Sequence, residues 1–376
     1  MRCQSRHVRI PHGGADARSL LDERMDICHV VPNLEPGEDG LGDYAWQLAK
    51  SLESLGFKNR FVVCGYANRH AQKLEPPTER TAFNIAMARE GDRESLAQAL
   101  GTRASSVSLL HYANFGYAAN GVPNWLADVA AAHRKSSFVT MFHETWQSPS
   151  LRQNRLYKWI FQKSCTLQIF SSSAGFCTNT APRFENFQNR DAVKPGFWSP
   201  VFSNIGERVT ASAKDEGLAV VFGLARNRQR CYLHLANQPD FLNTLGVTRI
   251  LDIGEGQIDI PARLGAITRF VGRLEPAEVS EILTKAEFGF IDYNPQVIGK
   301  SGVFAAYASH RVCVVNLDLS DRQAEVSLKK CFVPFRMQAN HDPGIVSDEA
   351  YRWYSDHNVK ATAERWGDLL HRILLG

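Results

Sequence analysis

The stretch that decides the fold is Ile27–Val63, ICHVVPNLEPGEDGLGDYAWQLAKSLESLGFKNRFVV. It opens with an apolar run, Ile27–Val31, and then enters a loop rich in glycine and proline. A helical period follows, with one apolar face made by Tyr44, Leu48, Leu52 and Leu55. Gly56 ends this helix, and a second apolar run, Phe61–Cys64, comes directly after it. The order strand, glycine loop, helix, strand predicts one right-handed βαβ unit of a parallel sheet.

The glycine loop of such a unit lies at the carboxyl end of its strand. Ligands of open parallel sheets bind at this edge, because the following helix offers unpaired N–H groups and a partial positive charge. Gly40 and Gly42 allow the backbone to come close to a ligand there. The stretch therefore predicts a doubly wound α/β protein with a ligand site beside residues 36–43.

Length and composition limit the classes of protein to consider. The 376 residues are 44% hydrophobic and 22% charged, which is typical of a globular protein with two domains. A formal net charge of +4 is too small to indicate a nucleic-acid partner, although it suits an anionic substrate such as a nucleotide diphosphate. We therefore expect two hydrophobic cores and no nucleic-acid partner.

The cysteine pattern and the N-terminus bear on the location of the protein. The eight cysteines form no C-x-x-C pair and no regular spacing with histidine, so we expect neither a zinc site nor a disulfide framework, and a cytoplasmic location. No apolar run is long enough for a transmembrane helix. Residues 1–24 carry five arginines without an apolar segment, which predicts a mobile extension. This extension is either a solvated tail or a peripheral contact with a membrane surface.

Two further predicted strands end in histidines. The run Val107–Tyr112 contains His111 near its end, and Phe138–Phe142 is followed by His143 and Glu144. Because the carboxyl ends of parallel strands meet in one crevice, these side chains should lie near the glycine loop. A single histidine at a strand end is usually structural, but two beside a glycine loop favour a functional site. We also expect residues 156–161 to be a core helix and residues 167–170 to be a strand.

Periodicity lapses between Arg183 and Gly217, which indicates the domain junction. A second βαβ series starts at Leu218. Its predicted strands are followed by Gly223 and by the basic residues Arg226, Arg228 and Arg273. We therefore predict an N-terminal domain over residues 25–200, a C-terminal domain over residues 201–345, and a C-terminal helix within residues 346–376 that crosses back to the first domain.

The segment Lys300-Ser301-Gly302 precedes another predicted helix. Ser301 is a suitable N-cap, Gly302 permits close approach of the backbone, and the helix N-terminus carries a partial positive charge. Together with the charge of Lys300, these features form a candidate anion site. The alternative is an ordinary helix cap beside a solvated lysine.

The loop Gly40-Leu41-Gly42-Asp43-Tyr44, the histidines at strand ends and the glycine followed by arginines resemble nucleotide-sugar glycosyltransferases of the GT-B fold, particularly the retaining family four. This resemblance implies two Rossmann-like domains facing across a cleft. It implies catalytic roles for His143, which would contact the donor sugar, and Glu144. It also implies acceptor binding near Gly40, Gly42, Asp43 and His111, and donor binding by Gly223, Arg226, Arg228, Arg273, Lys300, Ser301 and Gly302.

The sequence departs from this family in one respect. Val297 and Ala305 stand where the resemblance would place the two glutamates of an E-x7-E signature. No D-x-D sequence occurs, so a metal-clamped donor site is not expected, and no cofactor is implied. We thus expect metal-independent sugar transfer with retention from a nucleotide sugar to a sugar, glycan or lipid-linked acceptor. A nucleotide-sugar 2-epimerase and a non-catalytic sugar-nucleotide-binding protein of the same fold remain alternatives.

Overall fold

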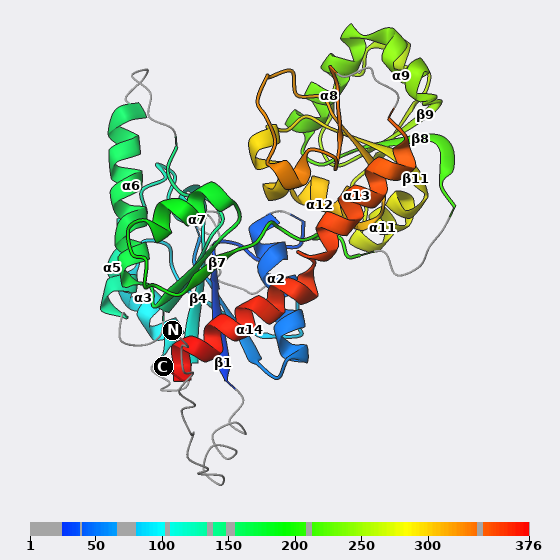
Figure 1. Cartoon of the computed structure of the whole chain (residues 1–376). Helices are drawn as coiled ribbons and strands as arrows, with labels where there is room; N and C mark the ends of the chain where they lie inside the picture. The colour runs from blue at the N-terminus through cyan, green and yellow to red at the C-terminus, as the bar shows by residue number, and fades with distance from the viewer. Residues whose placement is uncertain are drawn as a thin grey trace, which may run out of the picture.

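The computed structural model describes residues 25–37, 40–65, 80–101, 106–133, 138–147, 155–207, 213–336 and 341–375 (Figure 1). The predicted N-terminal extension, residues 1–24, lies outside the described residues. Two separate parallel sheets, one from each half of the chain, organise the rest. The expectation of an α/β protein with two doubly wound domains is confirmed.

The first sheet has seven strands in the order β3-β2-β1-β4-β5-β6-β7, and every neighbouring pair is parallel. Its order reverses at β1, so the loop after β1 lies at the switch point where ligands bind in such sheets. The strands are β1 Asp26–Val31, β2 Lys58–Val63, β3 Asn84–Met87, β4 Ser106–Tyr112, β5 Phe138–Phe142, β6 Gly175–Thr178 and β7 Gly196–Trp198.

Helices cover both faces of this sheet because alternate strand residues point to opposite faces. Ile27 of β1 packs in the core that includes α2, whereas Cys28 packs in the core on the other face. Tyr44, Leu48 and Leu52 of α2 are buried as predicted. The helices are α2 Gly40–Ser54, α3 Arg93–Leu100, α4 Asn114–Tyr117, α5 Asn124–Ala132, α6 Arg155–Ser172 and α7 Ala181–Gln188.

The second sheet has six strands in the order β10-β9-β8-β11-β12-β13, all parallel. Its strands are β8 Asp215–Phe222, β9 Arg249–Ile253, β10 Thr268–Gly272, β11 Ala286–Ile291, β12 Cys313–Asn316 and β13 Val333–Pro334. The helices between them are α8 Ala225–Asn237, α9 Pro239–Leu245, α10 Ala262–Gly265, α11 Pro276–Lys285 and α12 Gly302–Ser309, with the 3₁₀ turns η2 Pro295–Lys300 and η3 Val326–Leu328.

The C-terminal segment returns to the first domain. Helix α13, Pro343–Ser355, packs on α12, and helix α14, Val359–Leu375, packs against α2, as Figure 1 shows. Trp366 of α14 is fully buried and meets Phe197 edge to face. The two domains are thus joined by the connection that includes the described residues 199–207 and again by this final pair of helices.

Three predictions for residues 156–217 were wrong. Residues 167–170 are not a strand but part of α6, since Cys165, Ile169 and Phe170 are buried at helical spacing. The first turns of α6 are not core, because Leu156, Tyr157, Ile160 and Phe161 are exposed. The segment expected to be irregular also contains α7 and β7. Within the described residues, no helix combines the length and the apolar character needed to cross a membrane.

Candidate functional site

The glycine loop after β1 is held by Asp43. The Asp43 carboxylate accepts a hydrogen bond from the Gly37 backbone N–H at 3.2 Å and forms a salt bridge with Arg80. Burial raises the pKa of this carboxyl, and the Arg80 charge acts in the opposite direction. Asp43 therefore shapes the loop, and its predicted contact with an acceptor would have to be made in addition to these bonds.

Gly42 is required by a close approach of two backbone segments. A Cβ atom at this position would lie 2.3 Å from the carbonyl oxygen of Asn33, so no larger residue fits without a shift. Gly40, the first residue of α2, has more space: its nearest neighbour would be the Asn204 amide nitrogen at 3.5 Å. The two predicted acceptor-loop glycines thus have different roles, close packing for Gly42 and an open helix start for Gly40.

His143 and Glu144 lie directly after β5, at the carboxyl edge of the first sheet. The backbone oxygen of His143 accepts hydrogen bonds from Asn179 Nδ2 at 3.0 Å and from Arg183 Nη1 at 2.8 Å. Burial lowers the pKa of the His143 imidazole to about 3, and the charges of Lys300 and Arg183 act in the same direction. This histidine is neutral at physiological pH.

An ion pair joins the two domains at this point. Lys300 Nζ lies 3.3 Å from Glu144 Oε1, with side-chain exposures of 22% and 47% respectively. Arg183 and Tyr293 lie close enough to Glu144 for their pKa values to respond to its charge, although burial is the larger cause for both. Carboxylate, guanidinium and ammonium groups from two domains therefore lie near His143, and the Tyr293 phenol is within electrostatic range of Glu144.

The start of α12 is the second part of the site. The Ser301 hydroxyl accepts a hydrogen bond from the Phe304 N–H at 3.2 Å, so the predicted N-cap is present. Asn204 Nδ2 donates to the Gly40 carbonyl at 3.0 Å and would lie 3.9 Å from a Cβ atom on Gly302. The N-termini of α2 and α12 thus approach each other from opposite domains, with Asn204 between them.

Gly223 follows β8 and also lies at the start of α12. Its φ is +122°, and a Cβ atom there would meet Val303 at 3.3 Å. Arg226 comes next in the first turn of α8 and is exposed. Gly40, Gly223 and Gly302, which belong to three separate sequence segments, therefore surround one region.

Arg228 does not belong to this region. It is completely buried, pairs with Asp252, and donates to the carbonyl oxygens of Gly223 and Gly256 at 2.9 and 3.0 Å. A guanidinium used in this way stabilises the loops after β8 and β9, and an unpaired carboxylate would be left in the interior without it. The placement does not support the predicted phosphate contact of Arg228.

Arg273 bridges the domains. Its Nη2 donates to the Pro36 carbonyl at 2.7 Å and its Nη1 lies 3.1 Å from Glu255 Oε1.

His111 is fully buried between two other imidazoles and does not reach the surface of the cleft. Of the predicted residues, the structure brings His143, Glu144, Lys300 and Ser301 together with the three glycines.

Three residues of this region were missed by the sequence analysis: Arg183, Asn204 and Tyr293. Arg183 and Asn179 are spaced i and i+4 after β6, at the same sheet edge as His143. This spacing is visible in the sequence, but the strand was predicted at residues 167–170 instead of at β6, so Asn179 and Arg183 were not recognised as following a strand end. Asn204 lies in the irregular connection, where no periodicity marks a side chain.

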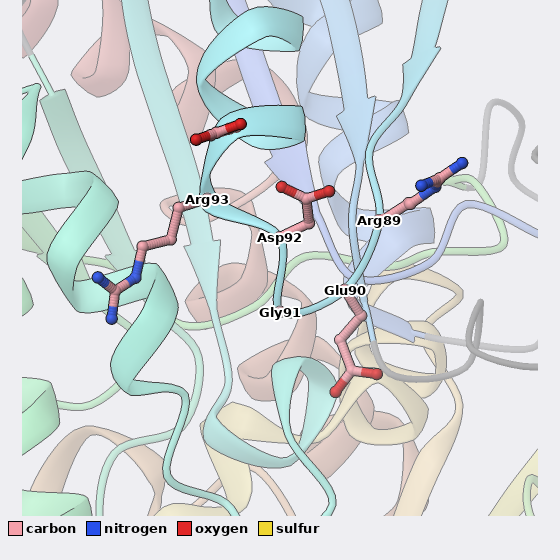
Figure 2. A pocket seen from close by; sticks show the side chains of 6 residues that line it. Arg89, Glu90, Gly91, Asp92 and Arg93 are labelled. Carbon is pink, nitrogen blue, oxygen red and sulfur yellow. The ribbon is translucent and has the colours of Figure 1, made fainter.

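Among the described residues, no group of three or more His, Cys, Asp and Glu side chains is placed to hold a metal ion. Figure 2 shows a pocket at the turn between β3 and α3, lined by Arg89–Glu94, in which the side chains of Arg89, Glu90 and Arg93 point away from one another. Asp92 there caps α3 by accepting from the Ser95 N–H at 2.9 Å. This turn holds none of the predicted site residues.

No protein-family model and no curated protein matches the amino-acid sequence. Solved structures do match. The pneumococcal O-GlcNAc transferase GtfA in complex with UDP and GlcNAc has a TM-score of 0.61 at 9% identity, covering 94% of this chain and 100% of that chain.

Two further structures match over similar lengths. An α-glucosyltransferase in complex with UDP and a 13-mer DNA containing an HMU base has a TM-score of 0.58 at 9% identity, with 94% and 100% coverage. The α,α-trehalose-phosphate synthase (UDP-forming) from Burkholderia xenovorans has a TM-score of 0.52 at 13% identity, with 94% and 100% coverage. The similarity extends across both domains, and the chain has the two-domain α/β fold of these GT-B glycosyltransferases.

Proposed function

We propose that the protein is a glycosyltransferase that moves a sugar from a nucleotide-diphosphate-sugar donor to an acceptor, without a metal ion and with retention of configuration. The observation that carries this proposal is the meeting of His143, Glu144, Lys300 and the N-terminus of α12 in a protein with the GT-B fold. The resemblance to the retaining family four remains a prediction within this proposal.

The donor diphosphate would bind at the start of α12. The helix N-terminus supplies N–H groups and partial positive charge, and Lys300 adds a full charge at the same place. Gly223 and Gly302 leave space for the phosphates, and Arg226 is available at the neighbouring first turn of α8. Such groups neutralise the charge that develops on a leaving diphosphate. Arg228 has no part in this assignment.

The sugar would lie between this anion site and His143. A neutral imidazole hydrogen-bonds a sugar hydroxyl without adding charge, and Arg183 holds the backbone that carries it. Glu144 neutralises part of the charge of Lys300 through their ion pair. Binding of a diphosphate would release Glu144 to face the sugar, as expected for its predicted role in the transfer step.

The acceptor belongs near Gly40 at the edge of the first domain. A sugar, a glycan or a lipid-linked sugar fits the resemblance. The comparisons do not support the exclusion of nucleic acid, because one similar structure holds DNA.

The seven cysteines of the described residues are free and buried, which supports our assignment of the reaction to the reducing cytoplasm.

A panel of nucleotide sugars tests the proposal. The protein is incubated with each nucleotide sugar and with sugar, glycan, lipid-linked and DNA acceptors, and released nucleotide is measured by chromatography. We expect nucleotide release that depends on an acceptor and persists in excess chelator. Formation of an epimer would favour the 2-epimerase, and binding without turnover the non-catalytic protein. Loss of activity with chelator and its return with Mg²⁺ or Mn²⁺ would overturn metal independence.

A further inference from the structure

A row of hydrogen-bonded side chains crosses the first sheet beneath α2. Asn59 Oδ1 lies 3.0 Å from His29 Nε2, His29 Nδ1 lies 3.1 Å from His111 Nε2, and His111 Nδ1 lies 3.2 Å from His143 Nε2. The rings of His29 and His111, and of His111 and His143, are stacked with centroids 5.3 and 5.5 Å apart. Four consecutive strands of the sheet thus contribute to one continuous chain of polar groups that ends at the proposed site.

The register of the sheet builds this row. Each member lies two residues further along its strand than the member before it, so all four project from the same face while the row climbs diagonally to the carboxyl edge. The register partners across each pair of strands are Asn59 with Ile27, His29 with Leu109, and His111 with Met141. A change of one residue in any of these registers would break the row.

The interior of the row is buried, and both of its ends reach the surface. His29 and His111 are 0% exposed, His143 is 8% exposed, and Asn59 is partly exposed. Burial lowers the pKa of His29 to about 4 and places the pKa of His111 well below its ordinary value. Each imidazole is therefore neutral and has one N–H group and one bare nitrogen.

Asn59 sets the direction of the whole row. Its Nδ2 donates to the carbonyl oxygens of Ala49 and Phe57 at 3.1 and 3.3 Å, which turns Oδ1 toward His29. His29 must then carry its proton on Nε2, because the opposite tautomer would set a bare nitrogen against a carbonyl oxygen.

The remaining tautomers follow in sequence. A bare Nδ1 on His29 requires an N–H at Nε2 of His111, and a bare Nδ1 on His111 requires an N–H at Nε2 of His143. The same rule then leaves Nδ1 of His143 without a proton. The position of one asparagine amide in β2 thus fixes which nitrogen of His143 can accept a hydrogen bond, three strands away.

We propose that Asn59, His29 and His111 are positioning residues that hold His143 as the Nε2–H tautomer, so that its Nδ1 accepts a hydrogen bond from a hydroxyl group of the bound sugar. This inference rests on the proposed function for the identity of the ligand. The tautomer itself does not depend on that function. A carbonyl group, such as that of an N-acetyl substituent, would meet a bare nitrogen at this position and be disfavoured.

Nitrogen–proton correlation spectra of histidine-labelled protein test the tautomers directly, because protonated and bare ring nitrogens have well-separated shifts. Signals are assigned with the variants His29→Gln, His111→Gln and His143→Gln. We expect Nε2–H for all three histidines at neutral pH. A proton on Nδ1 of His143 in the parent protein would overturn the proposal.

Two isosteric variants separate positioning from simple structural support. Asn59→Leu and Asn59→Asp both remove the bonds to Ala49 and Phe57, but only aspartate keeps an oxygen for the His29 N–H. We expect a mixture of His143 tautomers and an about tenfold lower kcat in Asn59→Leu, with a single Nε2–H tautomer and near-parental kcat in Asn59→Asp. Unchanged nitrogen–proton signals of His143 in Asn59→Leu would contradict the proposal that the row sets the tautomer of His143.

The spectra test the tautomer assignment and the assays test the proposed function, so each can be contradicted without the other. Absence of turnover with every nucleotide sugar would remove the proposed function and leave the tautomer assignment intact. Correct tautomers with equal kcat in Asn59→Leu and the parent protein would overturn the functional part of the inference.

Discussion

At the scale of single residues, the site depends on what His143 offers to a ligand. Its imidazole is neutral and is held through its backbone oxygen by Asn179 and Arg183. We expect His143→Ala to lower turnover by about 10² or more without unfolding the protein, because a hydrogen bond formed in the transition state would be lost. Steady-state kinetics and circular dichroism measure the two parts. Unchanged turnover would make His143 a structural residue.

A second pair of variants tests which ring nitrogen of His143 matters more for turnover. An asparagine oxygen can replace the Nδ1 acceptor of histidine, whereas a glutamine amide better replaces the Nε2–H donor to His111. His143→Asn should therefore keep more activity than His143→Gln, by about tenfold in kcat. The reverse order would mean that the bond to His111 matters more than the acceptor.

The same histidines make stability depend on pH. Since folding lowers the pKa of His29 and His143 to about 4 and about 3, the unfolded chain binds more protons below its ordinary pKa of 6.5. Stability is then complete above pH 6.5 and falls as the pH drops from there toward 4.

With His111 included, the free energy of unfolding should decrease by about 4 kcal/mol between pH 7.5 and 5.5, at about 1.4 kcal/mol per histidine. Urea denaturation at the two pH values measures this difference. Equal stability at both pH values would mean that the row is protonated in the folded protein.

At the scale of elements, the glycine loop shows how close packing limits the sequence. A methyl group on Gly42 would lie 2.3 Å from the Asn33 carbonyl oxygen, whereas one on Gly40 would have 3.5 Å to the Asn204 amide. Gly42→Ala should thus destabilise the protein by about 1–3 kcal/mol, and Gly40→Ala, at the helix start, by less than about 0.5 kcal/mol. Thermal denaturation of the pair measures the contrast, and similar melting temperatures would contradict it.

The elements that the sequence predicted well are those with a clear local period. Helix α2, Gly40–Ser54, was predicted from the apolar period of Tyr44, Leu48 and Leu52, which are buried, whereas Leu55, the last member of that period, is exposed and lies after the helix. Residues 167–170 were misread as a strand because four apolar or amide residues look alike in a buried helix and in a strand. The hydroxyls of Ser172 and Ser173 bond to the carbonyls four residues earlier, which is a helical contact that no local pattern reveals.

Site residues were predictable where they follow a strand and unpredictable where tertiary contacts decide their use. His143 and Glu144 were found because they end β5. Arg226 and Arg228 look equivalent in sequence, yet only Arg228 faces inward, where Asp252 of β9 pairs with it. Which arginine is buried depends on a carboxylate 24 residues away, and a single sequence does not show that contact.

At the scale of the whole molecule, three polar bonds among the described residues cross between the domains around the cleft. They join Lys300 to Glu144, Arg273 to the Pro36 carbonyl, and Asn204 of the connection to the Gly40 carbonyl. Of these groups, our proposal assigns Lys300, Glu144 and Gly40 to the substrate region. Substrate binding would therefore replace contacts between domains, and affinity should reflect both the new bonds and the ones that are lost.

This exchange makes opposite predictions for the two partners of the ion pair. Lys300→Ala removes the ammonium group proposed to bind the donor diphosphate, and should weaken nucleoside diphosphate binding by about 1.5–3 kcal/mol, the scale of a hydrogen bond to a charged group. Glu144→Gln removes the competitor of the phosphate. It should strengthen diphosphate binding by no more than about 1 kcal/mol, because the Glu144 carboxylate is 47% exposed and its pair is weak in water.

Isothermal titration calorimetry with a nucleoside diphosphate and with the matching nucleoside measures both effects. The nucleoside, which has no phosphate, is the control and should bind all three proteins equally. Arg311→Ala provides a matched loss of charge, since Arg311 pairs with Asp348 beside α13 and not with a cleft residue. Weaker diphosphate binding in Glu144→Gln, or equal binding in Lys300→Ala and the parent protein, would place the diphosphate away from the start of α12.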